Sequence, residues 1–227
     1  MLALAIVAAL FAAQAAVPPA PTRWVEDGVG LLSPATRSAL DARLEGYQHA
    51  TGHQVVVWIG DTLDGAPLDE WAVRTFAAWK VGRQGLDDGV AMFILVGDRA
   101  IDLEVGYGLE GRVTDAAVAQ IIARMAPRLR AGDRDGAVTT GVEAVLATIE
   151  GRPWTGASTP TDAPAGGPTT LQWILGILAA LGFLVLAITH PRFAMMLLWT
   201  VATAGRGRGG FAGGGGRSGG GGARGRW

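Results

Sequence analysis

The sequence predicts an α/β domain in which a mixed sheet packs against helices, and two observations predict it. Across residues 23–151, segments with helical apolar spacing alternate with short β-branched runs, in the order helix, strand, helix, strand, strand, helix, helix. Gly97-Asp98-Arg99 separates two of these runs as a tight turn, so the two strands are expected to pair antiparallel. With 227 residues, the chain is long enough for one such domain with appendages.

The first half of the domain contains a helix, a buried strand and a second helix. Ser33 is a good N-cap and Pro34 suits the first helical position. Apolar residues then recur at helical spacing up to Gly52, which ends the helix: Leu40, Leu44 and Tyr47. Residues 54–59 (QVVVWI) form a run rich in β-branched residues, which is typical of a strand covered on both faces. Residues 68–79 have the pattern of a second helix.

The second half begins with the hairpin strands 90–96 and 100–105. Thr114 is expected to cap a helix that runs to about Leu129, with Pro127 bending its last turn. A final helix covers residues 135–149.

The N-terminus has the features of a secretory signal peptide, residues 1–16. An apolar run from Leu2 ends at Ala13-Gln14-Ala15, an A-x-A cleavage site, although no basic residue precedes the run. A buried N-terminal helix, or a start codon placed too far downstream, would be the alternative. Beyond the domain, residues 152–170 are rich in Pro, Gly and Thr, which indicates a linker.

The C-terminal region has the pattern of a membrane anchor followed by a tail. Residues 171–189 begin with 18 uncharged, mostly apolar residues, which is long enough for one transmembrane helix. His190-Pro191-Arg192 interrupts the apolar region, so residues 190–204 form either an interfacial segment or a second membrane segment. Residues 205–227 contain 13 glycines and several arginines and are expected to be disordered.

The two signs of charge are segregated along the chain. Residues 1–170 contain 20 acidic and 13 basic residues, a net charge of −7, whereas the remainder contains six arginines and no acid. By the positive-inside rule, this predicts a single-pass protein of the cell membrane, with its domain outside the cytoplasm and its tail inside. A second crossing would reverse the side of the tail. The acidic domain offers no basic surface for nucleic acid, and the absence of cysteine excludes disulfides, zinc–thiolate sites and thiol nucleophiles.

Carboxylates gather where strands end and helices begin, which is where α/β folds place their sites. Asp87 and Asp88 open a strand, Glu104 ends the next, and Asp115 starts a helix. Such oxygens would suit calcium or magnesium, but they would equally well shape a turn or complement a helix dipole. Strand alternation places Asp102 on the same face as Glu104.

Several motifs together resemble those of the TPM-domain family. They occur in the family's order and cover nearly all of residues 23–150: residues 25–33 (VEDGVGLLS), 79–82 (WKVG), 87–90 (DDGV), 104–111 (EVGYGLEG), Thr114-Asp115 and Gly132-Asp133. The layout of signal peptide, domain, membrane helix and glycine-rich tail is similar to that of the YgcG-like bacterial branch. The tail departs from that pattern, because it carries arginines where relatives often have serine or phenylalanine.

The resemblance implies an α/β/α sandwich and, in some members, divalent-cation binding and acid phosphatase activity. It places the candidate metal ligands at Asp27, Asp87, Asp88, Glu104 and Asp115. Under this hypothesis the protein hydrolyses a phosphomonoester with the help of calcium or magnesium. The alternative is a non-enzymatic, calcium-binding or partner-binding module that assists membrane-protein maintenance. The resemblance implies such a role as well, because plant members of the family take part in photosystem II repair and others act as auxiliary factors for membrane proteins.

Overall fold

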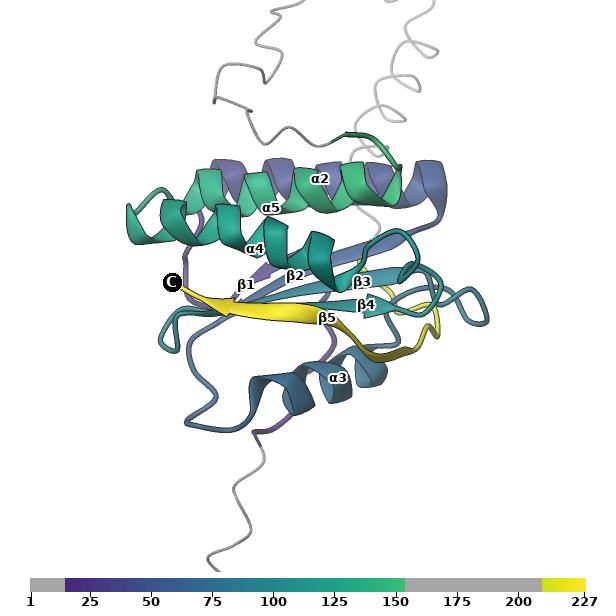
Figure 1. The fold of residues 1–227 in the computed structure, drawn as a ribbon, viewed down its shortest axis with the longest axis horizontal. Helices are drawn as coiled ribbons and strands as arrows, with labels where there is room; N and C mark the ends of the chain where they lie inside the picture. Colours follow the sequence, from purple (N-terminus) through teal and green to yellow (C-terminus); the bar gives the residue numbers. More distant parts are fainter. Residues whose placement is uncertain (1–14, 154–209) are drawn as a thin grey trace, which may run out of the picture. The chain divides into compact units, whose positions relative to one another are not determined.

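A mixed sheet of five strands forms the middle layer of the domain (Figure 1). The computed structural model describes residues 15–153 and 210–227, and both ranges belong to the same folded unit. The strands lie in the order in which they occur along the chain: β1 (Val25–Asp27), β2 (Gln54–Gly60), β3 (Gly89–Leu95), β4 (Ala100–Gly106) and β5 (Ser218–Arg226). The first three are parallel, whereas β4 runs antiparallel to both β3 and β5.

Helices cover both faces of this sheet. The described helices are α2 (Pro34–Thr51), α3 (Leu68–Trp79), α4 (Asp115–Arg130) and α5 (Arg134–Ile149). Helix α3 lies on one face, and α2, α4 and α5 lie on the other (Figure 1). The predicted α/β fold is therefore confirmed, with a mixed sheet between two helical layers.

The core on the α3 face is aromatic near β2 and β3 and becomes polar at β4. The ring of Trp71 lies 5.3 Å from Trp58 and 5.1 Å from Phe93, measured between centroids. Trp58 on β2 is in register with Phe93 on β3, and Phe93 in turn is in register with Asp102 on β4. The same row of the sheet thus leads from aromatic rings in tilted and edge-on contact, which stabilise the core, to a buried carboxyl group.

Side-chain caps explain where three of the four described helices, α2, α4 and α5, begin. The Ser33 hydroxyl accepts the N–H of Thr36 at 3.2 Å, and the Thr114 hydroxyl accepts the N–H of Ala117 at 3.3 Å. Both helices start where the sequence predicted. Helix α5 begins at Arg134, one residue before the prediction, because the side chain of Asp133 provides the cap.

The structure corrects two predictions. The short strand β1 was not expected, because three residues are too few to show a periodic pattern. The prediction of a disordered tail is wrong for residues 210–227, which include β5. Glycine has low β propensity, so the sequence pattern did not indicate a strand; pairing with β4 provides the hydrogen bonds that order it.

The residues after the predicted cleavage site are part of the domain. The indole N–H of Trp71 donates to the carbonyl of Ala16 at 3.0 Å, and that of Trp79 donates to the carbonyl of Pro18 at 2.9 Å. The extended segment that contains Pro18 and Pro19 is therefore held against α3. The two indole N–H groups, which would otherwise be buried without an acceptor, are satisfied.

The remaining predicted segments lie outside the described residues. These are the apolar run of the signal peptide, nearly all of the linker 152–170, the transmembrane helix 171–189 and the segment 190–204. Within residues 15–153 and 210–227, no helix combines the length and the apolar character needed to cross a bilayer.

Candidate functional site

Most of the predicted site residues lie at one end of the sheet, where β2 and β3 begin and β4 finishes. We call this the loop end; it is formed by His53, residues 82–88 and residues 106–111, and residues 210–217 lie across it. Asp87 and Asp88 belong to it directly. Asp27 does not, because it ends β1, which runs parallel to β2 and β3, and so lies at the opposite end of the sheet.

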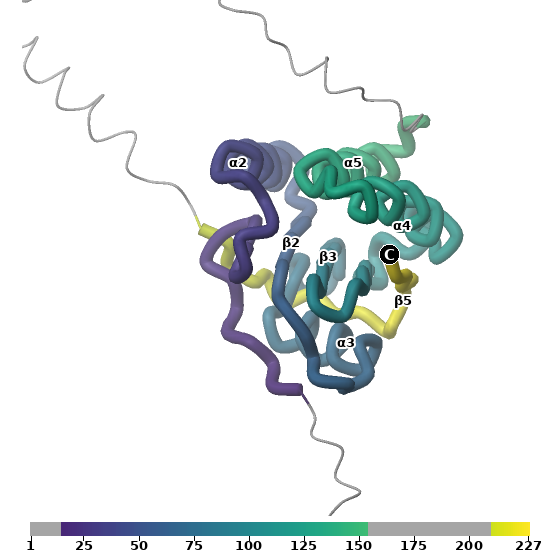
Figure 2. The backbone as a smooth tube through the Cα atoms, turned by 90° about the vertical axis from the view of Figure 1, so that its left-hand side faces the viewer, coloured from purple at the N-terminus to yellow at the C-terminus, as the bar shows by residue number. Residues whose placement is uncertain are grey.

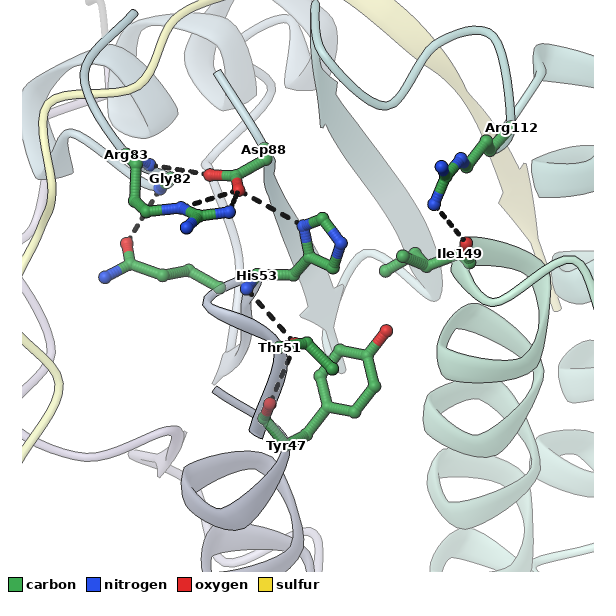
Figure 3. A network of polar contacts seen from close by, with 9 residues as sticks. Tyr47, Thr51, His53, Gly82, Arg83, Asp88, Arg112 and Ile149 are labelled. Carbon is green, nitrogen blue, oxygen red and sulfur yellow. Dashed lines mark hydrogen bonds and ion pairs between the residues drawn. The ribbon is translucent and has the colours of Figure 1, made fainter. Parts of the chain in front are cut away.

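Asp88 is the centre of a polar network at the loop end (Figure 3). Its Oδ1 accepts the backbone N–H of Arg83 at 2.9 Å, and its Oδ2 accepts the Nε–H of the same arginine at 2.8 Å. The Nη2 of Arg83 also contacts this oxygen, and Nδ1 of His53 lies 3.2 Å from it. Asp88 is buried, so these contacts replace the water that an exposed carboxylate would bind.

The network keeps Asp88 ionised. Burial by itself would raise the pKa of this carboxyl group, but the hydrogen bonds from Arg83 outweigh burial, and the pKa lies below its ordinary value. Gly82, next to this arginine, donates its N–H to the side chain of Gln54 at 2.8 Å. Asp88 therefore orders the loop before β3, a structural role that needs no bound ion.

Three other predicted ligands bind backbone N–H groups of the C-terminal segment. Asp87 Oδ1 accepts the N–H of Arg217 at 2.9 Å, and Asp115 Oδ1 accepts that of Gly222 at 2.9 Å. Glu104 Oε1 accepts the N–H of Gly220 at 3.1 Å. Backbone amides are good partners for carboxylates in such positions. These three acids therefore do share a binding partner, and in the structure that partner is the C-terminal segment of the same chain.

Asp27 shapes the turn after β1. Its two carboxylate oxygens accept the N–H groups of the turn that leads to α2, at 3.3, 3.0 and 2.9 Å from Val29, Leu31 and Leu32. This arrangement is an elaborate Asx-type turn. It holds the entry to α2 against the sheet, far along the strands from the loop end.

The five predicted ligands do not come together as a metal centre. Among the residues that the structure describes, no three His, Asp or Glu side chains are arranged to hold a metal ion. Each of the five carboxylates already accepts hydrogen bonds from protein groups, as described above. Cation binding by these residues thus stays a prediction.

The most perturbed acid, Asp102, was not among the predicted site residues. It is 6 % exposed, and its Oδ1 has no hydrogen-bond partner. Burial, and then the charge of Glu104, raise its pKa to about 8, against the weaker opposing effect of Arg224. Burial also raises the pKa of Glu104. Strand alternation showed that the two acids share a face, but it could not show that α3 and β5 cover that face.

A cavity of about 310 Å³ lies beside these acids, between α3 and β5. Its charged lining consists of Asp69, Asp102, Glu104 and Arg224. Arg224 Nη1 forms an ion pair with Asp69 Oδ2 at 2.6 Å, and Arg224 is in register with Asp102 across the β4–β5 pair. The cavity therefore combines a perturbed acid pair with one basic group.

Two large apolar side chains are exposed on adjoining loops at the loop end. Leu86 and Tyr107 are each 53 % exposed. Their loops are in direct contact, because the N–H of Gly108 donates to the carbonyl of Asp87 at 3.0 Å. A pair of exposed apolar groups beside charged residues is a common feature of protein-binding surfaces.

The chain is similar to a known family and to solved structures. A family model described as the TPM domain matches residues 25–148. The solution NMR structure of the N-terminal domain of a protein from P. gingivalis is 30% identical, with a TM-score of 0.53, over 58% of this chain and 84% of that one. The NMR structure of the BA42 protein from Bizionia argentinensis is 17% identical, with a TM-score of 0.47, over 54% of this chain and 85% of that one. No curated protein matches the chain.

The first prediction concerns the ion pair of Asp88. Because the pKa of this group is lowered on folding, its contribution to stability is complete above the unfolded-state pKa near 4 and is lost as the pH falls through the folded-state pKa. We expect Asp88→Asn to lower the free energy of unfolding by about 1–3 kcal/mol near neutral pH. The difference from wild type should shrink in urea titrations below about pH 4. Asp61→Asn, at an exposed acid, is the control and should have little effect at any pH.

The second prediction concerns Asp102. Because its pKa is raised to about 8 in the folded state, ionisation favours the unfolded state increasingly between about pH 4 and 8. Asparagine does not ionise, so Asp102→Asn should have a melting temperature that rises relative to wild type across this interval. Calorimetry of both proteins at several pH values measures it. A constant difference across the interval would show that Asp102 titrates normally.

Proposed function

Since this chain belongs to the TPM-domain family, we propose that it is a membrane-anchored binding module, placed outside the cytoplasm, that engages a membrane-protein partner through the loop end of its sheet. The observation that carries the proposal is the pair of exposed apolar side chains, Leu86 and Tyr107, on two loops that contact each other. Binding of a partner would remove these side chains from water, which is favourable in proportion to the apolar area buried.

The surroundings of this pair support recognition by a protein. The backbone of both loops is held in place by hydrogen bonds: Asp87 N–H donates to Arg83, and Leu109 N–H donates to Gly106. A preorganised surface loses little conformational entropy on binding. Charged side chains of both signs, including Arg83 and Glu110, lie on the same loops and would form a polar rim around the apolar centre.

The proposed location follows from the signal peptide 1–16 and the apolar segment 171–189 in the sequence. The fold is compatible with cleavage after Ala15. The indole hydrogen bonds to the N-terminal segment are made to Ala16 and Pro18, so cleavage at the A-x-A site after Ala15 would leave both in place. Removal of the whole range 1–16 would take away the carbonyl of Ala16 and leave only the bond from Trp79 to Pro18.

The third prediction tests the partner surface in cells. A photoreactive amino acid at position 86 or 107 of the full-length protein should crosslink to a membrane protein, whereas the same group at Ala39, an exposed position on α2, should not. The measurement is the pattern of crosslinked bands in the membrane fraction. Equal crosslinking at all three positions, or none at 86 and 107, would refute binding through the loop end.

A divalent-cation-dependent phosphatase is the second candidate, and one observation favours it. The cavity beside α3 contains Asp102, whose pKa of about 8 leaves it largely protonated at neutral pH. A protonated carboxyl group can donate a proton to the leaving oxygen of a phosphomonoester. Against this, the other acids of the cavity would repel a phosphate group, and Arg224 is already paired with Asp69.

The fourth prediction separates the two candidates. If the protein is a binding module, purified full-length protein should release no phosphate from a phosphomonoester above the rate in buffer, with calcium, magnesium or a chelator. Asp102→Asn should then behave like wild type in this assay. Phosphate release that a chelator removes, and that Asp102→Asn loses, would establish the phosphatase instead.

A further inference from the structure

We propose that the β4 edge and the loop end form a binding site for the chain's own glycine-rich segment 210–227, and that this docking keeps the segment on the same side of the membrane as the domain. The membrane part of this inference rests on the proposed function, because it presupposes an anchor. The docking part does not, since it follows from contacts within the described residues.

The segment first crosses the loop end, strand by strand (Figure 2). Phe211 is buried and packs edge-to-face on Trp24, which precedes β1, with centroids 5.3 Å apart. The side chain of Gln54, at the start of β2, donates to the carbonyl of Ala212 at 3.1 Å. The main chain then pairs with the residues that precede β3: Gly215 N–H with Lys80 O at 2.9 Å, and Gly216 N–H with Gly82 O at 2.8 Å.

The segment then turns along the sheet and becomes β5. Its residues pair with β4 from Gly106 back to Ala100, with one irregularity between Val105 and Gly106. The three carboxylate contacts described above lie on this path. At the end of the strand, the N–H of Trp227 donates to the carbonyl of Arg99 at 3.1 Å. Hydrogen bonds thus follow the segment along nearly its whole described length.

Close approach explains why the segment is rich in glycine. A Cβ atom on Gly213 would lie 1.9 Å from the carbonyl oxygen of Trp79, and one on Gly222 would lie 1.9 Å from that of Leu103. Real side chains do not tolerate such distances, and Gly222 also has a φ of 146°. An extended segment with side chains at these positions could not lie on this surface. The site is therefore selective for glycine at defined positions.

Charge complementarity favours the same pairing. The docked segment carries Arg217, Arg224 and Arg226, and the sequence up to residue 170 has a net charge of −7. Arg224 pairs with Asp69. The separation of an acidic domain from a basic tail led to the prediction of a cytoplasmic tail. The same separation also favours binding of the tail to the domain of its own chain. Because the segment and the domain belong to one chain, the effective concentration of the segment at its site is high.

Docking of segment 210–227 on the domain of the same chain has a consequence for the membrane topology. If segment 210–227 lies on the domain, the chain between residues 154 and 209 must return to the side from which it left. A single crossing by residues 171–189 is then excluded. The apolar region 171–204, interrupted by His190-Pro191-Arg192, must cross an even number of times or re-enter on the same side. The proposal therefore places the tail on the same side as the domain, in contrast to the cytoplasmic tail that the positive-inside rule predicts.

The fifth prediction uses the absence of cysteine, which makes any introduced disulfide unambiguous. Ala100 and Arg226 are directly opposite in the β4–β5 register, where Cα atoms are about 4.5–5.5 Å apart, within the range that disulfides span. We expect Ala100→Cys with Arg226→Cys, in the full-length membrane protein, to form a bond within one chain on mild oxidation. A protease site inserted in the linker 152–170 detects this disulfide. After cleavage at that site, the two fragments stay joined until the disulfide is reduced.

Two controls make the outcome decisive. Ala50→Cys with Arg226→Cys, which joins the exposed end of α2 to the tail, should give no intrachain bond. Adding Gly222→Ala to the reporter pair should reduce the yield severalfold, whereas adding Ala212→Ser at an exposed tail position should not. Disulfide-linked dimers would show that the segment docks on a second copy, and no bond at all would show that it does not dock; either result overturns the proposal.

The side of the membrane is measured separately. Single cysteines at Ala50 in the domain and at Arg217 in the tail should react alike with a membrane-impermeant maleimide in intact cells or sealed vesicles, and detergent should not change their relative labelling. Labelling of one position only would overturn the same-side proposal. If the full-length protein instead leaves the membrane on washing, the proposed anchoring fails, while the disulfide experiment still decides whether the tail docks.

Discussion

The pairing of β4 with β5 is the interaction on which the polar half of this domain depends. All seven residues of β4 are buried, including Asp102 and Glu104. Without β5, the outer edge of β4 would present a row of unpaired N–H and C=O groups to solvent, as exposed edge strands do. With it, the edge is closed by a strand whose glycines lie almost in contact with the neighbouring backbone. The raised pKa values of the two acids follow from the same burial.

The five predicted ligand acids form two groups, which differ in the part of the chain that donates hydrogen bonds to them. Asp27 and Asp88 stabilise the loops that carry them, the first through backbone N–H groups and the second mainly through Arg83. Asp87, Glu104 and Asp115 bind the backbone of a distant segment. A carboxylate that accepts well-aligned N–H bonds gains much of the stabilisation that a cation would provide. A cluster of acids in a sequence is therefore compatible with a peptide-binding surface as well as with a metal centre.

Helix boundaries were the most predictable part of the fold, because they depend on short-range chemistry. Ser33 and Thr114 accept hydrogen bonds from residues three positions later, and Gly52 ends α2 with a φ of 81°. The buried run of β2 and the tight β3–β4 turn were likewise predictable from neighbours in the chain. The candidate site was predicted in part: the pattern located four acids around one end of the sheet as candidate cation ligands, which stays a prediction, and it omitted Asp102. The desolvation of Asp102 comes from α3 and β5, which are remote in the sequence.

The sequence by itself determined the α/β class, the caps and the separation of an acidic domain from a basic, glycine-rich tail, because these depend on composition and on contacts between near neighbours. The tertiary structure decided what the tail does. Glycine has no side chain from which a strand could be predicted. Residues 210–227 are ordered by hydrogen bonds to the backbone of β4 and to carboxylates more than a hundred residues away in the sequence. Only when the chain is folded do those groups face one another, so their pairing could not be inferred from periodicity.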